Sequence, residues 1–157
     1  MNIDEWVALL RQSIESFNQY RAGHPTEPVN LFESDLSFSD LHDANLEGAD
    51  LRHCQLQGCN LAGAHLDGAR MELANLRSAT LAGASLRGVS VYYGTFQGAD
   101  LRRTAFHGAN LKKVSFCDAD LRGAVFTGAD FSEADLRWAN FELDDLADAD
   151  LSSARLR

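Results

Sequence analysis

The sequence is poor in the residues that build ordinary β-sheets and in those that cross-link small domains. Isoleucine and valine together account for 8 of the 157 residues, while leucine and alanine occur 22 times each. This balance argues against a β-sandwich and at first sight suggests helices. Three cysteines, an odd number, imply no disulfide framework. No apolar run approaches the length that crosses a membrane, so we expect no membrane partner.

Positive charge is also scarce. The chain has 14 Lys and Arg residues against 23 Asp and Glu residues, which gives a formal net charge of −9. Proteins that bind phosphate backbones concentrate positive charge, so we expect no direct nucleic-acid binding. The first residues show neither the basic stretch nor the apolar core of a secretory signal, and we therefore expect a cytoplasmic protein.

A five-residue repeat runs through most of the chain. From Leu31 to Leu156, every fifth residue is leucine, phenylalanine, methionine or valine, through 26 consecutive positions. A second register lies two residues earlier and holds mostly alanine, and the residue between the two registers is mostly Asp, Asn, Ser or Thr. Ala44-Asn45-Leu46 is one example of this pattern. Internal repeats of this regularity decide the fold before any local propensity does.

Neither regular element accommodates a period of five. In an α-helix, residues five apart are separated by roughly 140° around the axis, and in one strand they lie on opposite faces. The alanine and leucine of one repeat are two apart, so they point the same way in a short extended segment. If the chain turns after each segment, all of them can point inward, and four segments then close a coil of about 20 residues.

These repeats resemble those of the pentapeptide repeat family, and the resemblance covers residues 29–157. It implies an all-β solenoid, a right-handed quadrilateral β-helix, in which the central Leu or Phe and the preceding Ala fill the interior. We therefore expect a capping helix and proline-containing linker at 1–28, followed by a β-helix of about six and a half coils at 29–157. Small and medium interior side chains leave little room for a ligand, which argues against an enzyme.

Glycines sort by their place in the 20-residue coil. On one side of the coil, the residue two after the central one is glycine in five successive coils, from Gly48 to Gly128. On another side, the equivalent residues from Glu33 to Ser153 include no glycine. Because glycine suits a turn that needs a positive φ, we expect type II-like turns at most corners. We expect a different turn type on the glycine-free side.

Interior phenylalanines sort in the same way. Phe96 and Phe116 share one side of the coil, and Phe106 and Phe126 share the opposite side. Members of each pair are one coil apart, roughly 4.8 Å, which suits stacked rings. We therefore expect the core to be thickened by aromatic stacking in the second half of the solenoid.

The two ends of the solenoid differ in sequence. Apolar residues at helical spacing predict one amphipathic helix over residues 3–20, and Asn2 with Glu5 matches a capping box. We expect this helix to cover the first coil near Leu31 and Leu36, because a solenoid end otherwise exposes its core. The C-terminal coil has no such helix. Either its charges prevent end-to-end stacking, or it pairs with a second copy of the chain to form a homodimer.

Residues able to carry chemistry do not converge. The histidines at the repeats fall on three sides and several coils apart. Cys54 and Cys59 occupy inward, alanine-type positions, where cysteine acts as a small apolar residue. Cys117 occupies an outward position, and we expect a free surface thiol there. No metal-binding, nucleophile or phosphate-loop motif occurs, so we predict no metal, no cofactor and no catalytic residue.

The sequence favours a non-catalytic rigid scaffold for macromolecular interaction, with an unknown protein as the partner. Exposed aromatic residues beside arginine are typical anchors of interfaces. The candidate interaction surface consists of Tyr92, Tyr93, Arg137 and Trp138. The alternative interpretation is that these side chains only shield turns.

The alternative function comes from the family resemblance. Some members are acidic rods that mimic duplex DNA, bind DNA gyrase or a related enzyme such as topoisomerase IV, and modulate quinolone action. The candidate residues for such a surface are Glu47, Asp67, Asp145 and Asp148. A basic belt interrupts the acidic surface and does not suit simple mimicry. It consists of Arg102, Arg103, Lys112, Lys113 and Arg122.

Overall fold

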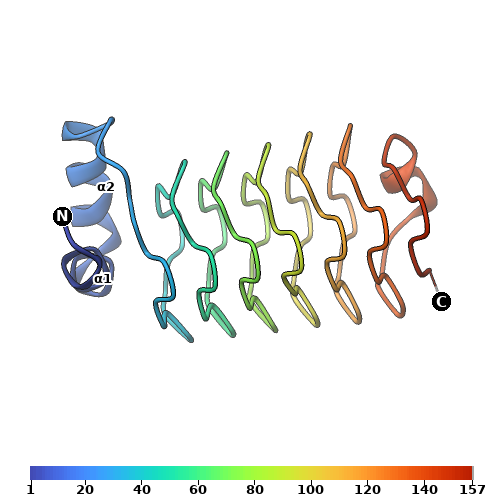
Figure 1. The fold of residues 1–157 in the computed structure, drawn as a ribbon, viewed down its shortest axis with the longest axis horizontal. Coiled ribbons are helices and arrows are strands. Elements are labelled where there is room, and N and C mark those ends of the chain that lie inside the picture. The colour runs from blue at the N-terminus through green and yellow to red at the C-terminus, as the bar shows by residue number, and fades with distance from the viewer. Residues whose placement is uncertain (157) are drawn as a thin grey trace.

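The computed structural model describes residues 1–156, a helical segment followed by a stack of coils. Helices α1 (Ile3–Gln12) and α2 (Ile14–Gly23) lie at one end of the stack, and a 3-10 helix, η1 (Leu143–Leu146), lies in the coil at the other end (Figure 1). None of the helices in this described range is long and apolar enough to cross a membrane.

The N-terminal segment forms two helices, so the prediction of one helix over residues 3–20 is wrong. Ser13 ends α1 in an extended conformation and begins α2, where its Oγ accepts a hydrogen bond from Ser16 N at 3.3 Å. A serine side chain satisfies a free amide at a helix start, so it favours a new helix there. The predicted capping box is confirmed, because Asn2 and Glu5 bond each other's backbone amides.

The two helices cover the first coil, as the amphipathic pattern predicted. Trp6 and Phe17 are fully buried and Leu10 is 2% exposed, all within the same core as the coils. The Arg21 guanidinium donates to the carbonyl of Glu47 at 3.0 Å. Asn18 donates from Nδ2 to a carbonyl of this coil and accepts from one of its amides. These side chains provide hydrogen-bond partners for the first coil, which has no preceding coil to pair with.

The coils pair with a register of 20 residues, as the repeat pattern predicted. Parallel bridges join Asn30 to Asp50, Asp35 to Gln55, and so on at five-residue steps along the chain. Four bridged positions per coil give four sides. Each bridge is isolated, so the extended backbone is limited to short segments between turns and Figure 1 shows no strand arrows. The β-solenoid is therefore held by single paired residues rather than by long strands.

Left-handed backbone occurs at every kind of corner. The glycine corners have φ between +61° and +70°. On the glycine-free side, the equivalent residues from Glu33 to Ser153 have φ of +59° to +60°. The expected difference in turn type was based on the sign of φ, and that expectation is wrong. Coil-to-coil pairing holds these backbones in the same region whether or not glycine is present.

The interior consists of the two predicted registers. The central Leu, Met, Val and Phe side chains from Leu31 to Leu136 are at most 1% exposed. Phe96 stacks on Phe116 and Phe106 on Phe126, each pair with ring centroids 5.3 Å apart. The predicted aromatic stacking is therefore confirmed. Such close packing fills the core and fixes the positions of the side chains that point outward.

The last coil departs from the regular pattern. Within residues 1–156, Val125 has no bridge to position 145, because the chain there winds into η1. The Asp145 carboxylate accepts instead from Gly123 N at 3.3 Å and from Glu142 N at 3.0 Å. Pairing resumes between Asp130 and Asp150. The charged side chain at Asp145 thus takes over part of the backbone pairing that the coil loses.

Candidate functional site

Four corner edges run along the solenoid, and we number them in chain order. The first edge, which we call the glycine-free edge, differs from the others because every corner residue has a side chain. Its members are Glu33, His53, Leu73, Tyr93, Lys113, Glu133 and Ser153. The left-handed conformation costs a non-glycine residue about 1–2 kcal/mol, so seven side chains are placed here at a cost in stability. Uncommon backbone of this kind gathers at functional sites more than elsewhere.

Leu73 and Tyr93 form the apolar centre of this edge. They lie one coil apart, and 50% of Leu73 and 52% of Tyr93 are exposed. Tyr92 lies half-buried beside Tyr93, with ring centroids 4.5 Å apart in an edge-to-face arrangement. Exposed apolar side chains that are adjacent, rather than scattered, mark contact surfaces.

Lys113 lies against the two tyrosines. Its Nζ donates to the hydroxyl of Tyr93 at 3.2 Å and lies 5.1 Å from the centroid of that ring and 5.9 Å from that of Tyr92. The ammonium favours the phenolate, so it lowers the pKa of Tyr93, and the same hydrogen bond raises the pKa of Lys113. The three side chains therefore hold one another in a fixed arrangement at the surface.

Charged and aromatic groups flank this centre on both sides. Toward the helices, Phe32 packs edge-to-face on His53 with centroids 5.5 Å apart, and the Arg52 guanidinium lies 5.2 Å from the Phe32 ring. Toward the C-terminus, the Glu133 carboxylate lies 3.5 Å from Lys113 Nζ. An apolar centre with a polar rim is the usual anatomy of a protein interface.

The second predicted pair lies elsewhere. Trp138 is 68% exposed at the end of the second edge, and the Arg137 guanidinium lies 5.1 Å from its ring centroid. Arg137 also forms a two-point ion pair with Asp135, at 2.8 and 2.6 Å, which lowers the pKa of that carboxyl to about 2. The structure therefore brings Tyr92 to Tyr93 and Arg137 to Trp138, but it places the two pairs two coils apart on different edges.

The four acidic candidates likewise form two separate groups. Glu47 and Asp67 lie one coil apart near the helical end, while Asp145 and Asp148 line one hollow of about 260 Å³ at the other end. Asp67 is already engaged, because its carboxylate accepts from Ser85 Oγ and from the amide of the residue that follows Leu86. That residue and the equivalent ones in the next two coils interrupt the acidic series on this side. They are Arg87, His107 and Thr127.

The predicted basic belt is divided in the same way. Lys112 and Lys113 belong to the glycine-free edge, whereas Arg102, Arg103 and Arg122 line a hollow at the third edge, diagonally across the coil. The coil register explains the division, because positions ten residues apart lie on opposite sides of a 20-residue coil. A continuous band of positive charge is therefore absent from the described residues.

One cysteine prediction is wrong. Cys117 is only 9% exposed, and Asp135 and Arg137 of the next coil lie beside its thiol. Cys54 and Cys59 are buried as predicted, and burial raises their pKa values to about 12 and about 11. Through residue 156, no three His, Cys, Asp or Glu side chains are grouped closely enough to hold a metal ion.

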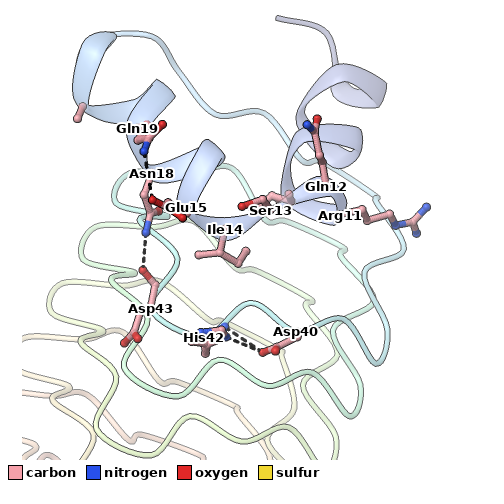
Figure 2. A pocket seen from close by; sticks show the side chains of 12 residues that line it. Arg11, Gln12, Ser13, Ile14, Glu15, Asn18, Gln19, Asp40, His42 and Asp43 are labelled. Atoms are coloured by element: carbon pink, nitrogen blue, oxygen red, sulfur yellow. Dashed lines mark hydrogen bonds and ion pairs between the residues drawn. The ribbon is translucent and has the colours of Figure 1, made fainter.

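A hollow of about 790 Å³ lies where the helices meet the first coil (Figure 2). Ile14 points into it from α2. On the coil below, His42 Nδ1 lies 2.9 Å from Asp40 Oδ1. The ion pair raises the pKa of His42. Asn18 spans the hollow's edge to the carbonyl of Asp43 at 2.9 Å. These polar groups are already hydrogen-bonded within the protein, so we interpret the hollow as part of the contact between the helices and the first coil.

The family of the chain follows from the repeats. The family model for pentapeptide repeats matches in eight copies, over residues 30–66, 54–90, 94–123 and 106–142. The chain is a pentapeptide repeat protein. No match was found among curated proteins.

Solved structures include other pentapeptide repeat proteins. One, from the thylakoid lumen of Arabidopsis thaliana, is 29% identical with a TM-score of 0.50, over 62% of this chain and 72% of the other. HetL, involved in heterocyst differentiation regulation in the cyanobacterium Nostoc, is 30% identical with a TM-score of 0.39, over 82% and 70%. QnrB1, a plasmid-mediated fluoroquinolone resistance protein, is 25% identical with a TM-score of 0.48, over 83% and 75%.

Within this pentapeptide repeat protein, the sequence-based surfaces did not include Leu73, and they assigned Lys113 to the basic belt rather than to the surroundings of Tyr93. The 20-residue period places Leu73 and Lys113 at the corners on either side of Tyr93. An apolar and a cationic residue that flank an exposed tyrosine on one edge are the sequence signal that could have identified this patch. Most leucines of this chain occupy the central, inward position of a repeat. Leu73 instead lies at a corner, and this position explains why it is half exposed.

Proposed function

We propose that this pentapeptide repeat protein is a non-catalytic, rigid scaffold that binds another protein through its glycine-free edge. The observation that supports this most strongly is the pair formed by Leu73 and Tyr93, each about half exposed at a left-handed corner. Glycine would suit both corners better, and ten corners of the same solenoid use it. The side chains are therefore kept at a cost in stability, which supports a role in binding.

The chemistry of the edge indicates the partner surface. The apolar centre suits an apolar or aromatic side chain. The cations beside it are paired within the chain, Lys113 with Glu133 at 3.5 Å and Arg52 with Asp50 at 2.6 Å, so the rim carries both signs of charge. We propose a partner segment with an apolar anchor and polar neighbours that match this mixed rim. Rings that are held in place lose little entropy on binding, which makes Tyr93 the main expected anchor.

The solenoid supplies the rigidity. Its interior side chains are closely packed, and every coil repeats the spacing of the one before, so corner residues recur at roughly 4.8 Å. We propose the right-handed, quadrilateral form that the family resemblance implies. A filled interior leaves binding to the outer surface, which supports a scaffold over an enzyme.

A second candidate function is DNA mimicry toward DNA gyrase or topoisomerase IV. The acidic hollow formed by Asp145 and Asp148 at one end is the feature that favours it. Arg87 and His107 separate this hollow from Glu47 and Asp67, so the acidic surface is shorter than a mimic of duplex DNA would need. Addition of the purified protein to a gyrase supercoiling assay tests it. Inhibition or quinolone protection at micromolar protein, lost in Asp145→Asn with Asp148→Asn, would favour this function over the scaffold.

Self-association through the C-terminal coil is a further part of the proposal. Leu151 and Ala154 in this coil are only partly buried, and Leu156 is 48% exposed. Light scattering at tens of micromolar protein measures it directly. A dimer that Leu156→Glu dissociates supports pairing through this coil, and a monomer excludes it.

Affinity capture with matched variants tests the scaffold function. The immobilised protein, the double variant Leu73→Gly with Tyr93→Gly, and the control Ser78→Gly with Asp118→Gly are exposed to the same extract. Both doubles place glycine at left-handed corners, so neither conflicts with the backbone. We expect one protein to be retained by wild type and control and lost from the first double. Equal retention on all three would contradict the proposal.

A further inference from the structure

The third edge contains a basic hollow that the scaffold function does not use. Its volume is about 510 Å³, and it lies diagonally across the coil from the glycine-free edge. Ala82 and Gly83 line it, together with residues one and two coils further along the chain. The lining is completed by Arg102, Arg103 and Arg122. Three guanidiniums around one hollow are unusual in a chain with a net charge of −9.

Two of the guanidiniums are fixed in place. Arg102 donates from Nε and Nη2 to the two oxygens of Asp100, at 2.8 and 2.7 Å. Arg122 pairs in the same way with Asp120, at 2.9 and 2.6 Å. Each pair uses one edge of the guanidinium and leaves Nη1 without a partner among residues 1–156. Such two-point pairs orient the remaining donors before any ligand arrives.

The third guanidinium is uncommitted. Arg103 has neither an ion pair nor a side-chain hydrogen bond within the part of the chain that the structure describes. It occupies a left-handed corner with φ of +59°, between Gly83 and Gly123, which have φ of +70° in the same edge. An arginine in a row where its neighbours are glycine is placed there at a cost in stability.

The charges that face the hollow do not cancel. Asp100 and Asp120 are the carboxylates that face Arg102 and Arg122, and both are held by the Nε and Nη2 edges. Arg102 Nε also lies 3.9 Å from Asp120 Oδ2, which joins the two pairs into one network. Two carboxylates thus oppose three guanidiniums in the lining, and the guanidinium without an ion pair among residues 1–156 is that of Arg103. A further carboxylate, that of Asp145, accepts from Gly123 N at 3.3 Å, at the next corner of the same edge.

We propose that this hollow binds a phosphate group, either free or as a monoester. A phosphate monoester carries a charge of about −1.5 to −2 at pH 7 and three acceptor oxygens, which match several guanidinium donors arranged around one point. The volume exceeds that of one phosphate, so there is room for the group that bears it. The phosphate comes either from free inorganic phosphate or from a phosphorylated serine or threonine of a protein. The site lies apart from the glycine-free edge and is independent of the scaffold function.

Titration of the 157-residue chain tests the proposal. The probes are inorganic phosphate and N-acetyl-O-phosphoserine amide, at constant ionic strength, followed by backbone amide chemical shifts. We expect saturable binding with the largest shifts at Gly83, Arg103 and Gly123. Tighter binding of the phosphoserine derivative identifies a phosphorylated side chain as the ligand, and equal affinity identifies free phosphate.

Variants separate binding from folding. Arg103→Gly gives this corner the residue found at its neighbours, and Arg103→Gln removes the charge while keeping the side-chain length. We expect each to weaken binding at least tenfold, whereas Arg87→Gln, which removes a positive charge on another side, changes affinity less than twofold. Shifts that do not saturate, or equal weakening by Arg87→Gln, would overturn the proposal. Preferential binding of a short oligonucleotide over the phosphoserine derivative would also overturn it.

Discussion

Leu73 and Tyr93 occupy the same corner of successive coils, each with φ of +60° and each with about half of its side chain exposed. The carbonyl of Tyr92 accepts from Leu73 N at 3.1 Å, so backbone pairing fixes the distance between the two side chains. The coil therefore presents an apolar pair in a conformation that neither residue prefers. This relationship connects the stability of the solenoid with its proposed role.

Glycine at such a corner should stabilise the fold. We expect Leu73→Gly to raise the free energy of unfolding by about 0.5–1 kcal/mol. The variant removes a left-handed strain of about 1–2 kcal/mol, and the greater conformational entropy that glycine loses on folding offsets about 0.5–1 kcal/mol of this gain. Urea denaturation measures the change. In the reciprocal variant Gly88→Ala, the added Cβ meets no atom within 4 Å, so it causes no clash. Backbone strain alone should therefore lower the free energy of unfolding by about 1 kcal/mol. A lower free energy of unfolding in Leu73→Gly, or an unchanged or higher one in Gly88→Ala, would refute the strain argument.

The stacked phenylalanines should dominate core stability in the second half. Phe106 is fully buried and contacts Phe126 at 5.3 Å and Phe96 at 5.9 Å between centroids. We expect Phe106→Ala to lower the free energy of unfolding by about 3–5 kcal/mol. Phe38→Ala is the matched control, because Phe38 is 77% exposed, and its effect should stay within about 0.5 kcal/mol. Equal decreases in the free energy of unfolding for the two variants would show that the buried ring stack does not contribute specially to stability.

Acid should weaken the fold in a defined range of pH. Arg137 holds the pKa of Asp135 at about 2, while an unfolded aspartate has a pKa of about 3.9. The folded-state pKa is the lower one, so the stabilisation is complete above about pH 4 and is lost as the pH falls toward 2.

Urea denaturation at a series of pH values checks this range. We expect Asp135→Asn to lower stability at pH 7 and to flatten its decline between about pH 4 and 2. Asp118→Asn removes an equal charge at an exposed corner and should leave that decline unchanged. An unaltered pH profile in Asp135→Asn would count against the ion pair.

The interior thiols should be unreactive in the folded protein. Burial raises the pKa of Cys54 to about 12 and that of Cys59 to about 11, so almost none of either is thiolate at pH 8. A colorimetric thiol reagent should modify them at least about 100-fold more slowly in buffer than in urea. Rapid modification of two thiols in the folded protein would show that the interior is not packed as described.

The period of five was enough to predict the coil register, the inward residues and the stacked rings, because each depends only on position within 20 residues. The break at Ser13 was missed, since the apolar stripe runs through both helices and gives no sign of a new cap. The backbone of the glycine-free edge was missed because pairing between coils overrides the preference of residues such as Tyr93. Cys117 was misplaced because its cover comes from Asp135 and Arg137, in the next coil.

Of the candidate surfaces, the sequence predicted the local pairs but not their relation to one another. Tyr92 with Tyr93, and Arg137 with Trp138, are neighbours in the chain and remain neighbours in space. Whether two pairs join depends on which edge each occupies and how many coils lie between them. The positions of Leu73 and Lys113 around Tyr93 follow from the same register, which makes the edge, rather than the tyrosine pair alone, the surface to test.

Photocrosslinking from position 93 detects a partner bound at the glycine-free edge. Benzoylphenylalanine replaces Tyr93 in one preparation and Asp118, at the corner of the second edge, in another, and both are irradiated in the same extract. We predict one dominant protein adduct from position 93 that is absent from position 118 and is suppressed by Leu73→Gly. Adducts of equal yield from the two positions, or none from position 93, would contradict this prediction.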